Sequence, residues 1–473
     1  MTPRPRRAVW TRLFWAGAGL ALLAASAWQH SLAARPQPPA AAFVVSQLLA
    51  GAVYLAAVYA AFNRPPVRAI LRGRPQGVPE GPRTASVSYL LLIGIACRLI
   101  LLPTPPLFDD DIHRYLWDGK VLAHGINPFR YAPQADELSY LRDANWRQIG
   151  YPHIPTIYPP LAQVLLGLSY ALGARTVVAL KSVFFLFDLA NMALIILLLG
   201  RLGRPRSWAL VYAWSPLASK EFANSGHVEP VMLFFTLLAF WFWLARKPGA
   251  GRAGASLGAA ISVKFAPALL LPIAARLGRW RSVAAAAGLV IALYLPFAGA
   301  GKQLFHGAGA YAQAWTFNDG AFALLSRAQS LVMPGASILS VSLARALVAV
   351  VIAAYAVYAG WRLAASDRLA ALRTSRNVLA LCLLLAPTVD PWYVCWLLPF
   401  LAVAPSPGLL VFTVTSNLCY LYYAHRTFPV WIPIAEYVPV YLLLVGEWLR
   451  SRWLRARETP GVSRNGQAAT PAS

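Results

Sequence analysis

Three consecutive aspartates, Asp109, Asp110 and Asp111, form the densest group of ionisable side chains in the chain. They are followed by Arg114 and Asp118, so Asp110, Arg114 and Asp118 would share one helix face by i,i+4 spacing. Adjacent carboxylates repel one another, which raises the pKa of at least one, and such a group can act as a general base. The Asp109-x-Asp111 spacing also suits a divalent metal ion such as Mg or Mn. A solvated helix N-terminus, where acidic side chains are favourable, is the alternative interpretation.

Further polar and aromatic side chains stand where apolar runs are interrupted. Lys264 interrupts one such run, and a lone cation in the bilayer costs about 2.5–3.5 kcal/mol on insertion scales, which favours a functional role. A side chain that only reaches the membrane surface is the alternative. His227 follows another break and could instead cap a helix. The candidate side chains at these breaks are Glu221, Asn224, His227, Lys264, Asp390, Trp392 and Tyr393.

The composition identifies the elements that must position these groups. The 473-residue chain is 58% hydrophobic and 12% charged, whereas soluble globular proteins carry about 25% charged residues. A membrane span needs roughly 20 mostly apolar residues, and runs such as 183–200 and 341–358 approach or reach that length. The sequence therefore predicts an all-α polytopic membrane protein and excludes soluble, fibrous and disordered classes. The runs are continuous rather than alternating, which argues against a β-barrel.

The net charge of +25 comes from 42 Lys and Arg against 17 Asp and Glu. These basic residues cluster in short segments, such as 64–83 and 201–206, which is typical of cytoplasmic loops. No basic surface interleaved with aromatic residues points to nucleic acid as a partner. The four cysteines lie in apolar surroundings without ligand-type spacing, and are interpreted as small core residues.

Placing the basic clusters inside the cell predicts about 11 to 13 membrane helices, some short or broken. The polar stretch 108–156 and a second loop, 300–335, then lie on the extracytoplasmic side. A cleavable signal peptide is an alternative to an uncleaved first span. The mid-span Asp188 is expected to pair with a neighbouring helix. The predicted spans cover about 13–29, 41–62, 87–106, 177–200, 283–298 and 337–362, with two more before the tail. The run 377–404 is broken at its outer turn by residues 387–393, and the runs 157–175 and 253–275 do not fit as single full crossings.

Several short motifs together resemble the GT-C membrane glycosyltransferases, and the nearest resemblance is to bacterial polyprenol-phosphate-mannose-dependent mannosyltransferases. The string from Asp110 to Gly119, including Tyr115, Trp117 and Asp118, is similar to the first-loop motif of that family. The resemblance covers roughly residues 86–450, leaving an N-terminal two-span segment at 1–85 and a disordered cytoplasmic tail at 451–473. Asp390 stands where many relatives have His. The other matching pieces are Asn127-Pro128-Phe129, Tyr158-Pro159-Pro160, Asn224-Ser225-Gly226-His227, Lys264-Phe265-Ala266-Pro267 and Pro391-Trp392-Tyr393 with Trp396.

The resemblance implies transfer of a hexose, mannose by analogy, from a polyprenyl-phosphate donor to an acceptor hydroxyl outside the cytoplasmic membrane. A polyprenyl phosphate leaves readily, so cations that stabilise it matter more than a general acid. Arg114, His227 and Lys264 are the candidates for binding the donor phosphate. A carboxylate must take the acceptor proton: Asp110 or Asp111, with Asp109 next. Single displacement would invert the anomeric centre. Some GT-C enzymes use a metal ion, for which Asp109 and Asp111 are the candidate ligands.

The same resemblance assigns substrate binding to a larger set of residues and leaves other functions to be weighed. Trp392 and Tyr393 could stack on a sugar ring or lie in the aromatic belt of the membrane interface. The acceptor could be a glycan, a glycolipid or a protein. The alternative function is a lipid-linked sugar flippase or another transporter, and a scaffolding role is a third. The residues assigned to substrate binding are Tyr115, Trp117, Asp118, Tyr158, Glu221, Asn224, Asp390, Trp392 and Tyr393.

Overall fold

The computed structural model describes residues 5–62, 85–245, 247–332 and 337–458, and within them it is all-α. The extended contacts among these residues amount to one isolated bridge, between Phe317 and Thr388. Six helices in this part of the chain are long and apolar enough to cross a membrane, and four shorter apolar helices accompany them. The protein is therefore a polytopic membrane protein, as the sequence predicts. The predicted loop 64–83 and the end of the tail lie outside the described residues.

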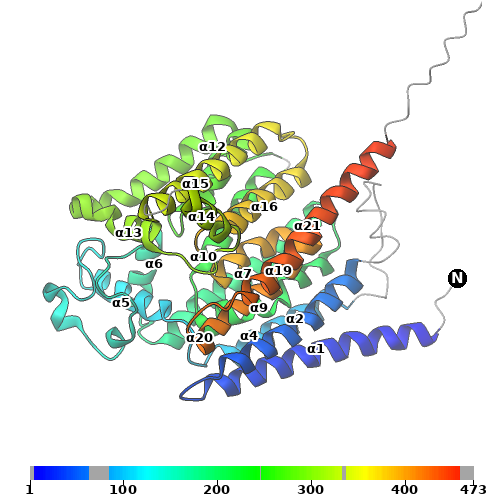
Figure 1. The fold of residues 1–473 in the computed structure, drawn as a ribbon, viewed down its shortest axis with the longest axis horizontal. Coiled ribbons are helices and arrows are strands. Elements are labelled where there is room, and N and C mark those ends of the chain that lie inside the picture. Colours follow the sequence, from blue (N-terminus) through cyan, green and yellow to red (C-terminus); the bar gives the residue numbers. More distant parts are fainter. Residues whose placement is uncertain (1–4, 63–84, 246, 333–336, 459–473) are drawn as a thin grey trace, which may run out of the picture.

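The first three helices pack side by side along one edge of the molecule (Figure 1). Helix α1 (Pro5–Ala33) contacts both α2 (Ala40–Phe62) and α4 (Val87–Leu101). The side chain of Ser86 caps α4 by accepting a hydrogen bond from the Tyr89 amide. Helix α4 ends at Leu101, five residues before the predicted end of the span, because the chain turns at the following prolines.

The polar segment, residues 108–156, folds around a small core of its own. Helix α5 (Asp111–Ala123) packs against α6 (Pro160–Ala171), and Gly119 allows the backbone of Leu166 to approach closely. Two short 3₁₀ turns, Asp136–Leu141 and Trp146–Gln148, complete the segment. The side chains that form its buried core are Trp117, Val121, Leu138, Leu141 and Ile149.

Broken helices occur at the prolines and polar residues where the sequence predicts them. The segment after Ser207 breaks at Ser215–Pro216 and continues as a π-helical turn, Ser219–Ser225, which ends at Gly226 with a φ of +79°. Lys264 lies in the turn between α11 (Ala250–Ile261) and the 3₁₀ helix Ala266–Leu270. The other helices of this central part are α7 (Val177–Arg201), α8 (Leu210–Ala213), α9 (Pro216–Ala218), α10 (Glu229–Trp243) and α12 (Leu271–Tyr294), the last with a kink at Arg279.

The C-terminal part contains helices in two regions where the sequence predicts none: the outer loop 300–335 and the start of the tail at 451. The 300–335 segment holds α13 (His306–Ala314) and α14 (Gly320–Val332). Helix α21 (Trp431–Glu458) extends past residue 451, so the predicted tail begins later than expected. The remaining helices are α15 (Ser337–Arg362), α16 (Arg368–Leu385), α17 (Pro391–Val394), α18 (Leu398–Val403), α19 (Pro407–Thr415) and α20 (Tyr422–His425).

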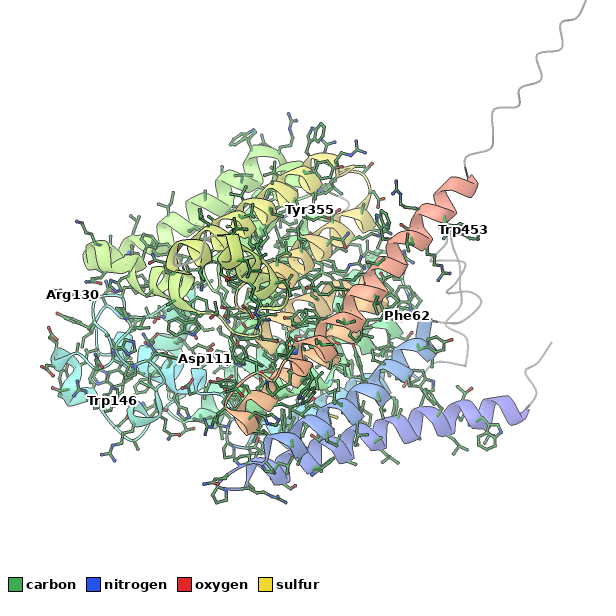
Figure 2. All side chains as sticks on the ribbon, in the orientation of Figure 1. Phe62, Asp111, Arg130, Trp146, Tyr355 and Trp453 are labelled. Carbon is green, nitrogen blue, oxygen red and sulfur yellow. The ribbon has the colours of Figure 1, made fainter. Side chains whose placement is uncertain are left out.

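The polar segment lies at the opposite end of the molecule from the C-terminal ends of α2 and α21. Figure 2 shows Asp111, Arg130 and Trp146 toward one end, and Phe62 and Trp453 toward the other. The helices between them are held by a buried ion pair between Arg98 of α4 and Asp188 of α7, both fully buried. This confirms that Asp188 pairs with a neighbouring helix.

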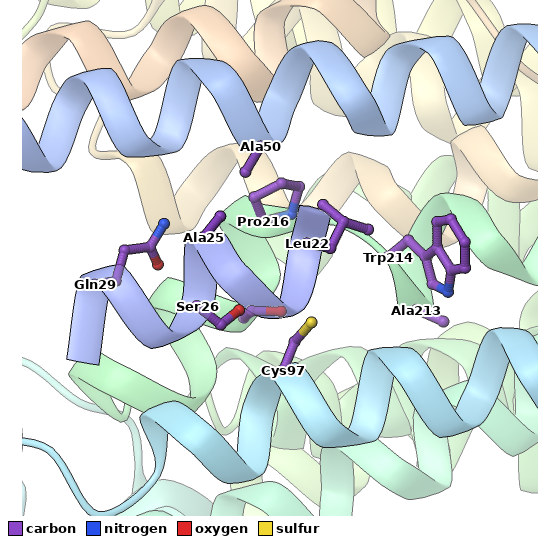
Figure 3. Close-up of a pocket in the computed structure, with 10 residues that line it drawn as sticks. Leu22, Ala25, Ser26, Gln29, Ala50, Cys97, Ala213, Trp214 and Pro216 are labelled. Atoms are coloured by element: carbon purple, nitrogen blue, oxygen red, sulfur yellow. The ribbon is translucent and has the colours of Figure 1, made fainter. Parts of the chain in front are cut away.

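A small cavity lies where α1 and α4 meet the break before the π-helical turn. Its volume is about 10 Å³, the lower limit for a single water molecule. Ser26, Gln29, Cys97 and Trp214 are among the side chains around it (Figure 3). The lining of this cavity has no acidic or basic side chain, so the candidate site lies elsewhere.

Candidate active site

A cavity of about 570 Å³ lies between the polar segment and the turn that carries Lys264. Its other walls are α13 with the loop after it, the stretch around α17, and residues 420–423. Its size is that of a small-molecule site, and it combines a few charged groups with many aromatic rings. The charged side chains in its lining are Asp109, Asp110, Asp111, Arg114, Lys264 and Asp390. The aromatic side chains in its lining are Phe108, Tyr151, Tyr158, Phe265, Tyr311, Trp315, Phe317, Trp392, Tyr393, Trp396, Tyr420, Tyr422 and Tyr423.

The three adjacent aspartates point in different directions because the chain enters α5 between them. Asp109 is almost buried, and its Oδ1 accepts a hydrogen bond of 2.8 Å from the Asp111 amide. Asp111 begins α5 and is partly exposed. Asp110 precedes the helix with non-helical backbone angles and is exposed to the cavity. The prediction that Asp110 shares a helix face with Arg114 is therefore wrong, since the helix starts one residue later.

Asp110 faces Gly150 across the cavity wall. A side chain at Gly150 would collide with the Asp110 carboxylate, so the two segments approach as closely as glycine allows. Withdrawal from bulk water, together with the negative charges of Asp111 and Asp109, raises the pKa of Asp110 to about 7. A carboxyl group with a pKa near neutrality can exchange a proton with a substrate hydroxyl.

His227 is fully buried behind the cavity and contacts the acidic group. Its Nε2 lies 2.5 Å from Asp109 Oδ2 and 3.5 Å from Glu221 Oε2, and its Nδ1 lies 3.5 Å from Asp111 Oδ2. The imidazole also stacks on Trp392, which does line the cavity. The charge of His227 therefore acts on carboxylates, and the structure does not place it on the cavity wall as a direct phosphate ligand.

Glu221 is held by a second buried group. Lys220 Nζ lies 3.2 Å from Glu221 Oε2, and the Tyr420 hydroxyl donates a 2.8 Å hydrogen bond to Glu221 Oε1. Lys220 also contacts the Tyr420 hydroxyl. This network fixes Glu221, and through it the imidazole of His227.

Lys264 is one of two cations in the cavity lining. It forms an ion pair with the fully buried Glu229 at the start of α10. Its Nζ lies 5.0 Å from the centre of the Tyr393 ring and 6.0 Å from that of Tyr158. The ion pair and the two neighbouring π faces both stabilise the ammonium group in this mostly buried position.

Arg114 offers a second cation to the cavity. Its Nε donates a 2.8 Å hydrogen bond to Asp118 Oδ1, as the i,i+4 spacing predicts, and its Nη1 donates to the Ile154 carbonyl. Asp118 in turn accepts from Gln163. Arg114 Nη2 is buried without a hydrogen-bond partner among the described residues. This donor is free for an anionic ligand.

Comparisons with known proteins place the chain in a family. A family model described as Alpha-(1->6)-mannopyranosyltransferase, N-terminal domain, matches residues 13–278, more than half of the chain. The chain belongs to this family. It is therefore a membrane glycosyltransferase of the mannosyltransferase type. No curated protein and no solved structure matched.

The matched range of the mannosyltransferase includes Asp109–Asp111, His227 and Lys264, but not Asp390 or Trp392. It also begins earlier than residue 86, where the sequence motifs start. The N-terminal helices that pack against α4 thus belong to the matched region together with the cavity's acidic group.

Five residues predicted to bind substrate lie outside the cavity lining and stabilise the structure around it. Trp117 is buried in the core of the polar segment, and Tyr115 is buried against Tyr158, with its hydroxyl 3.4 Å from Asp111. Asp118 orients Arg114. Asn224 accepts a hydrogen bond from the Leu107 amide and donates to Thr104 and Pro105, which fixes the exit of α4. Glu221 is likewise buried away from the cavity.

The mannosyltransferase site also contains residues that the sequence analysis did not select. Tyr151, Tyr311, Trp315 and Tyr423 line the cavity. No local motif marks these aromatic rings, because chain folding brings them together from distant segments. Lys220 directly precedes Glu221 in an apolar helix, and that signal could have identified it.

One group of side chains in the site could hold a metal ion. Ligand atoms of Asp109, Asp111 and His227 all lie within 4.8 Å of one another. Two carboxylates and an imidazole would suit Mg or Mn. The same arrangement suits a protonated imidazole held between two carboxylates, because each ring nitrogen faces a different aspartate.

Proposed function

We propose that the protein transfers mannose from a polyprenyl-phosphate donor to an acceptor hydroxyl at the extracytoplasmic face of the cytoplasmic membrane, forming an α-(1→6) linkage. The observation that carries this proposal is the cavity itself. It places the acidic group, two cations and aromatic rings together at one end of a membrane protein that belongs to a mannosyltransferase family.

The donor phosphate is bound by Arg114 and Lys264. Arg114 and Lys264 both line the cavity, and Arg114 Nη2 has no hydrogen-bond partner among the described residues. Each side chain is held in place by its own buried carboxylate. As the bond between the anomeric carbon and the phosphate oxygen breaks, negative charge grows on the phosphate. Fixed cations stabilise that charge without needing to rearrange.

Asp110 acts as the general base. Its carboxylate lines the cavity and has a pKa near neutrality, whereas Asp111 and Asp109 are engaged with His227. The acceptor oxygen attacks the anomeric carbon, its proton moves to Asp110, and the polyprenyl phosphate leaves. This single displacement inverts the anomeric centre. An α-linked product therefore requires a β-linked donor.

The orientation of the site follows from charge. The basic segments 201–206 and 246–252 are typical of cytoplasmic loops, and in the sequence both are separate from the acidic group at 109–111. The polar segment with its acidic residues then faces the outside, where a lipid-linked donor and a glycan, glycolipid or protein acceptor can meet. Family membership favours this transferase over a flippase, which would need no base beside the cations.

Transfer in reconstituted vesicles tests the proposal. Synthetic β- and α-mannosyl polyprenyl phosphates are offered with an acceptor, and NMR reports the anomeric configuration of the product. We expect product from the β donor alone, in the α configuration. Transfer should fall sharply in Asp110→Asn and in Asp111→Asn, and persist in Asp136→Asn, an exposed carboxylate of the same segment. Transbilayer movement of the donor without any product would instead support the flippase.

A further inference from the structure

Trp315 is fixed in the cavity wall by a short extended contact with the loop before α17. The Phe317 amide donates to the Pro387 carbonyl at 3.1 Å, and the Val389 amide donates to the Phe317 carbonyl at 2.9 Å. The Thr388 hydroxyl also donates to the Trp315 carbonyl at 3.0 Å. These hydrogen bonds join the 300–335 segment to the stretch that carries Asp390. They fix the backbone of Trp315, whose side chain lines the cavity.

Tyr151 meets Trp315 from the polar segment. The two ring centres are 4.6 Å apart with the planes 65° from parallel. Tyr151 has a left-handed backbone with a φ of +52°, which is costly for a residue with a side chain. The residue nevertheless remains 58% exposed. A strained backbone that holds an aromatic ring open to a cavity points to a ligand for that ring.

The pair lies beside the proposed base. Tyr151 directly follows Gly150, which packs against the Asp110 carboxylate. On its other side Trp315 contacts Tyr311, with ring centres 5.3 Å apart. The hydroxyls of Tyr311 and Tyr393 lie 2.7 Å apart, and the Tyr393 ring faces Lys264. A continuous row of aromatic rings therefore runs from Tyr151 to the cation assigned to the donor phosphate.

We propose that Tyr151 and Trp315 form the acceptor subsite and bind the apolar face of a sugar ring that the acceptor carries. This inference rests on the proposed function. Aromatic side chains offer a large rigid apolar surface, and a pyranose ring presents C–H groups on one face and hydroxyls at its edge. A sugar packed on this pair presents its edge to Asp110. Tyr151 comes from the polar segment and Trp315 from the end of α13, so neither ring lies within one of the six long apolar helices.

Kinetics with a mannooligosaccharide acceptor test the subsite. In nanodiscs, Trp315→Ala and Tyr151→Ala should each raise the acceptor KM roughly tenfold, with the donor KM unchanged. Trp315→Phe keeps a ring on the same backbone and should recover most of the loss. Tyr140→Ala is the control, because Tyr140 is a similarly exposed ring of the polar segment outside the cavity lining. A raised donor KM with an unchanged acceptor KM would overturn the proposal, as would a loss of kcat alone.

A direct binding measurement separates the subsite from catalysis. Isothermal titration of the same oligosaccharide into nanodiscs without donor should show binding that Trp315→Ala weakens and Tyr140→Ala does not. If the wild type binds the oligosaccharide through Trp315 yet transfers no mannose from any donor, the subsite stands and the proposed function fails. If transfer proceeds and neither aromatic variant changes acceptor binding or KM, the subsite fails and the proposed function stands.

Discussion

Trp392 stacks on the imidazole of His227, with ring centroids 4.0 Å apart and ring planes 22° from parallel. The indole therefore stands between His227 and the cavity, which Trp392 lines and His227 does not. Each ring nitrogen of His227 faces a different aspartate, which suits a doubly protonated imidazole. An imidazolium under an indole face gains a further attraction to the π electrons.

Transfer should accordingly be insensitive to chelators. A single metal ion would use one nitrogen of His227, whereas both nitrogens here face carboxylates. We expect EDTA to leave the initial rate within about twofold, and we expect no tight Mn²⁺ binding by electron paramagnetic resonance. His227→Gln should lose transfer in buffers with and without Mn²⁺. Rates that vanish in EDTA and return with Mn²⁺ would instead establish Asp109, Asp111 and His227 as metal ligands.

Variants of the ion pair between Lys264 and Glu229 should show whether Lys264 is needed for stability, for transfer, or for both. Lys264→Gln leaves the fully buried Glu229 carboxylate without its partner, which costs about 3–5 kcal/mol. The double variant Lys264→Gln/Glu229→Gln removes both charges, so it should recover most of the thermal stability while transfer remains lost. Thermal unfolding in detergent and donor kinetics check the two parts. Normal transfer by the double variant would show that Lys264 only balances Glu229.

The sequence predicted where the helices break better than it predicted which neighbours the side chains contact. Proline and polar residues at Ser215–Pro216 and after Ile261 interrupt the helices as expected, because proline lacks an amide donor whatever surrounds it. The spacing also predicted the bond between Arg114 and Asp118. Spacing alone could not show which element covers that face, and in the structure Gln163 of α6 lies there.

The aromatic wall of the cavity could not be predicted for a related reason. Tyr151 and Trp315 lie far apart in the chain, and their contact depends on the bridge between Phe317 and Thr388. The partner of Asp188 was predicted only as a neighbouring helix, since several spans could have supplied it. Arg98, the only basic residue of α4, could have been proposed from the same rule that selected Lys264.

The buried ion pair between Arg98 and Asp188 should contribute to the stability of the fold. Asp188→Asn leaves the guanidinium of Arg98 fully buried and short of a counter-charge, which should lower the free energy of unfolding by about 3–5 kcal/mol. Asp367→Asn makes the same chemical change at an exposed helix N-cap, where asparagine caps nearly as well, and should alter stability little. Thermal unfolding of both variants in one detergent gives the comparison. Equal stability of the two would mean that the backbone carbonyls around Arg98 suffice to hold it.

The pH dependence of transfer should report the ionisation of Asp110. The base must be deprotonated to accept the acceptor proton, and its pKa is raised to about 7 by burial and by the charges of Asp111 and Asp109. The value of kcat/KM should therefore rise with pH and level off above about 7. Asp110→Asn should lose roughly 10²- to 10⁴-fold in rate, with the residual rate no longer following that titration. Asp136→Asn should keep both the rate and the profile, because its carboxylate is fully exposed in the same segment. A profile that survives unchanged in Asp110→Asn would assign the titration, and the role of base, to another carboxylate of the cavity.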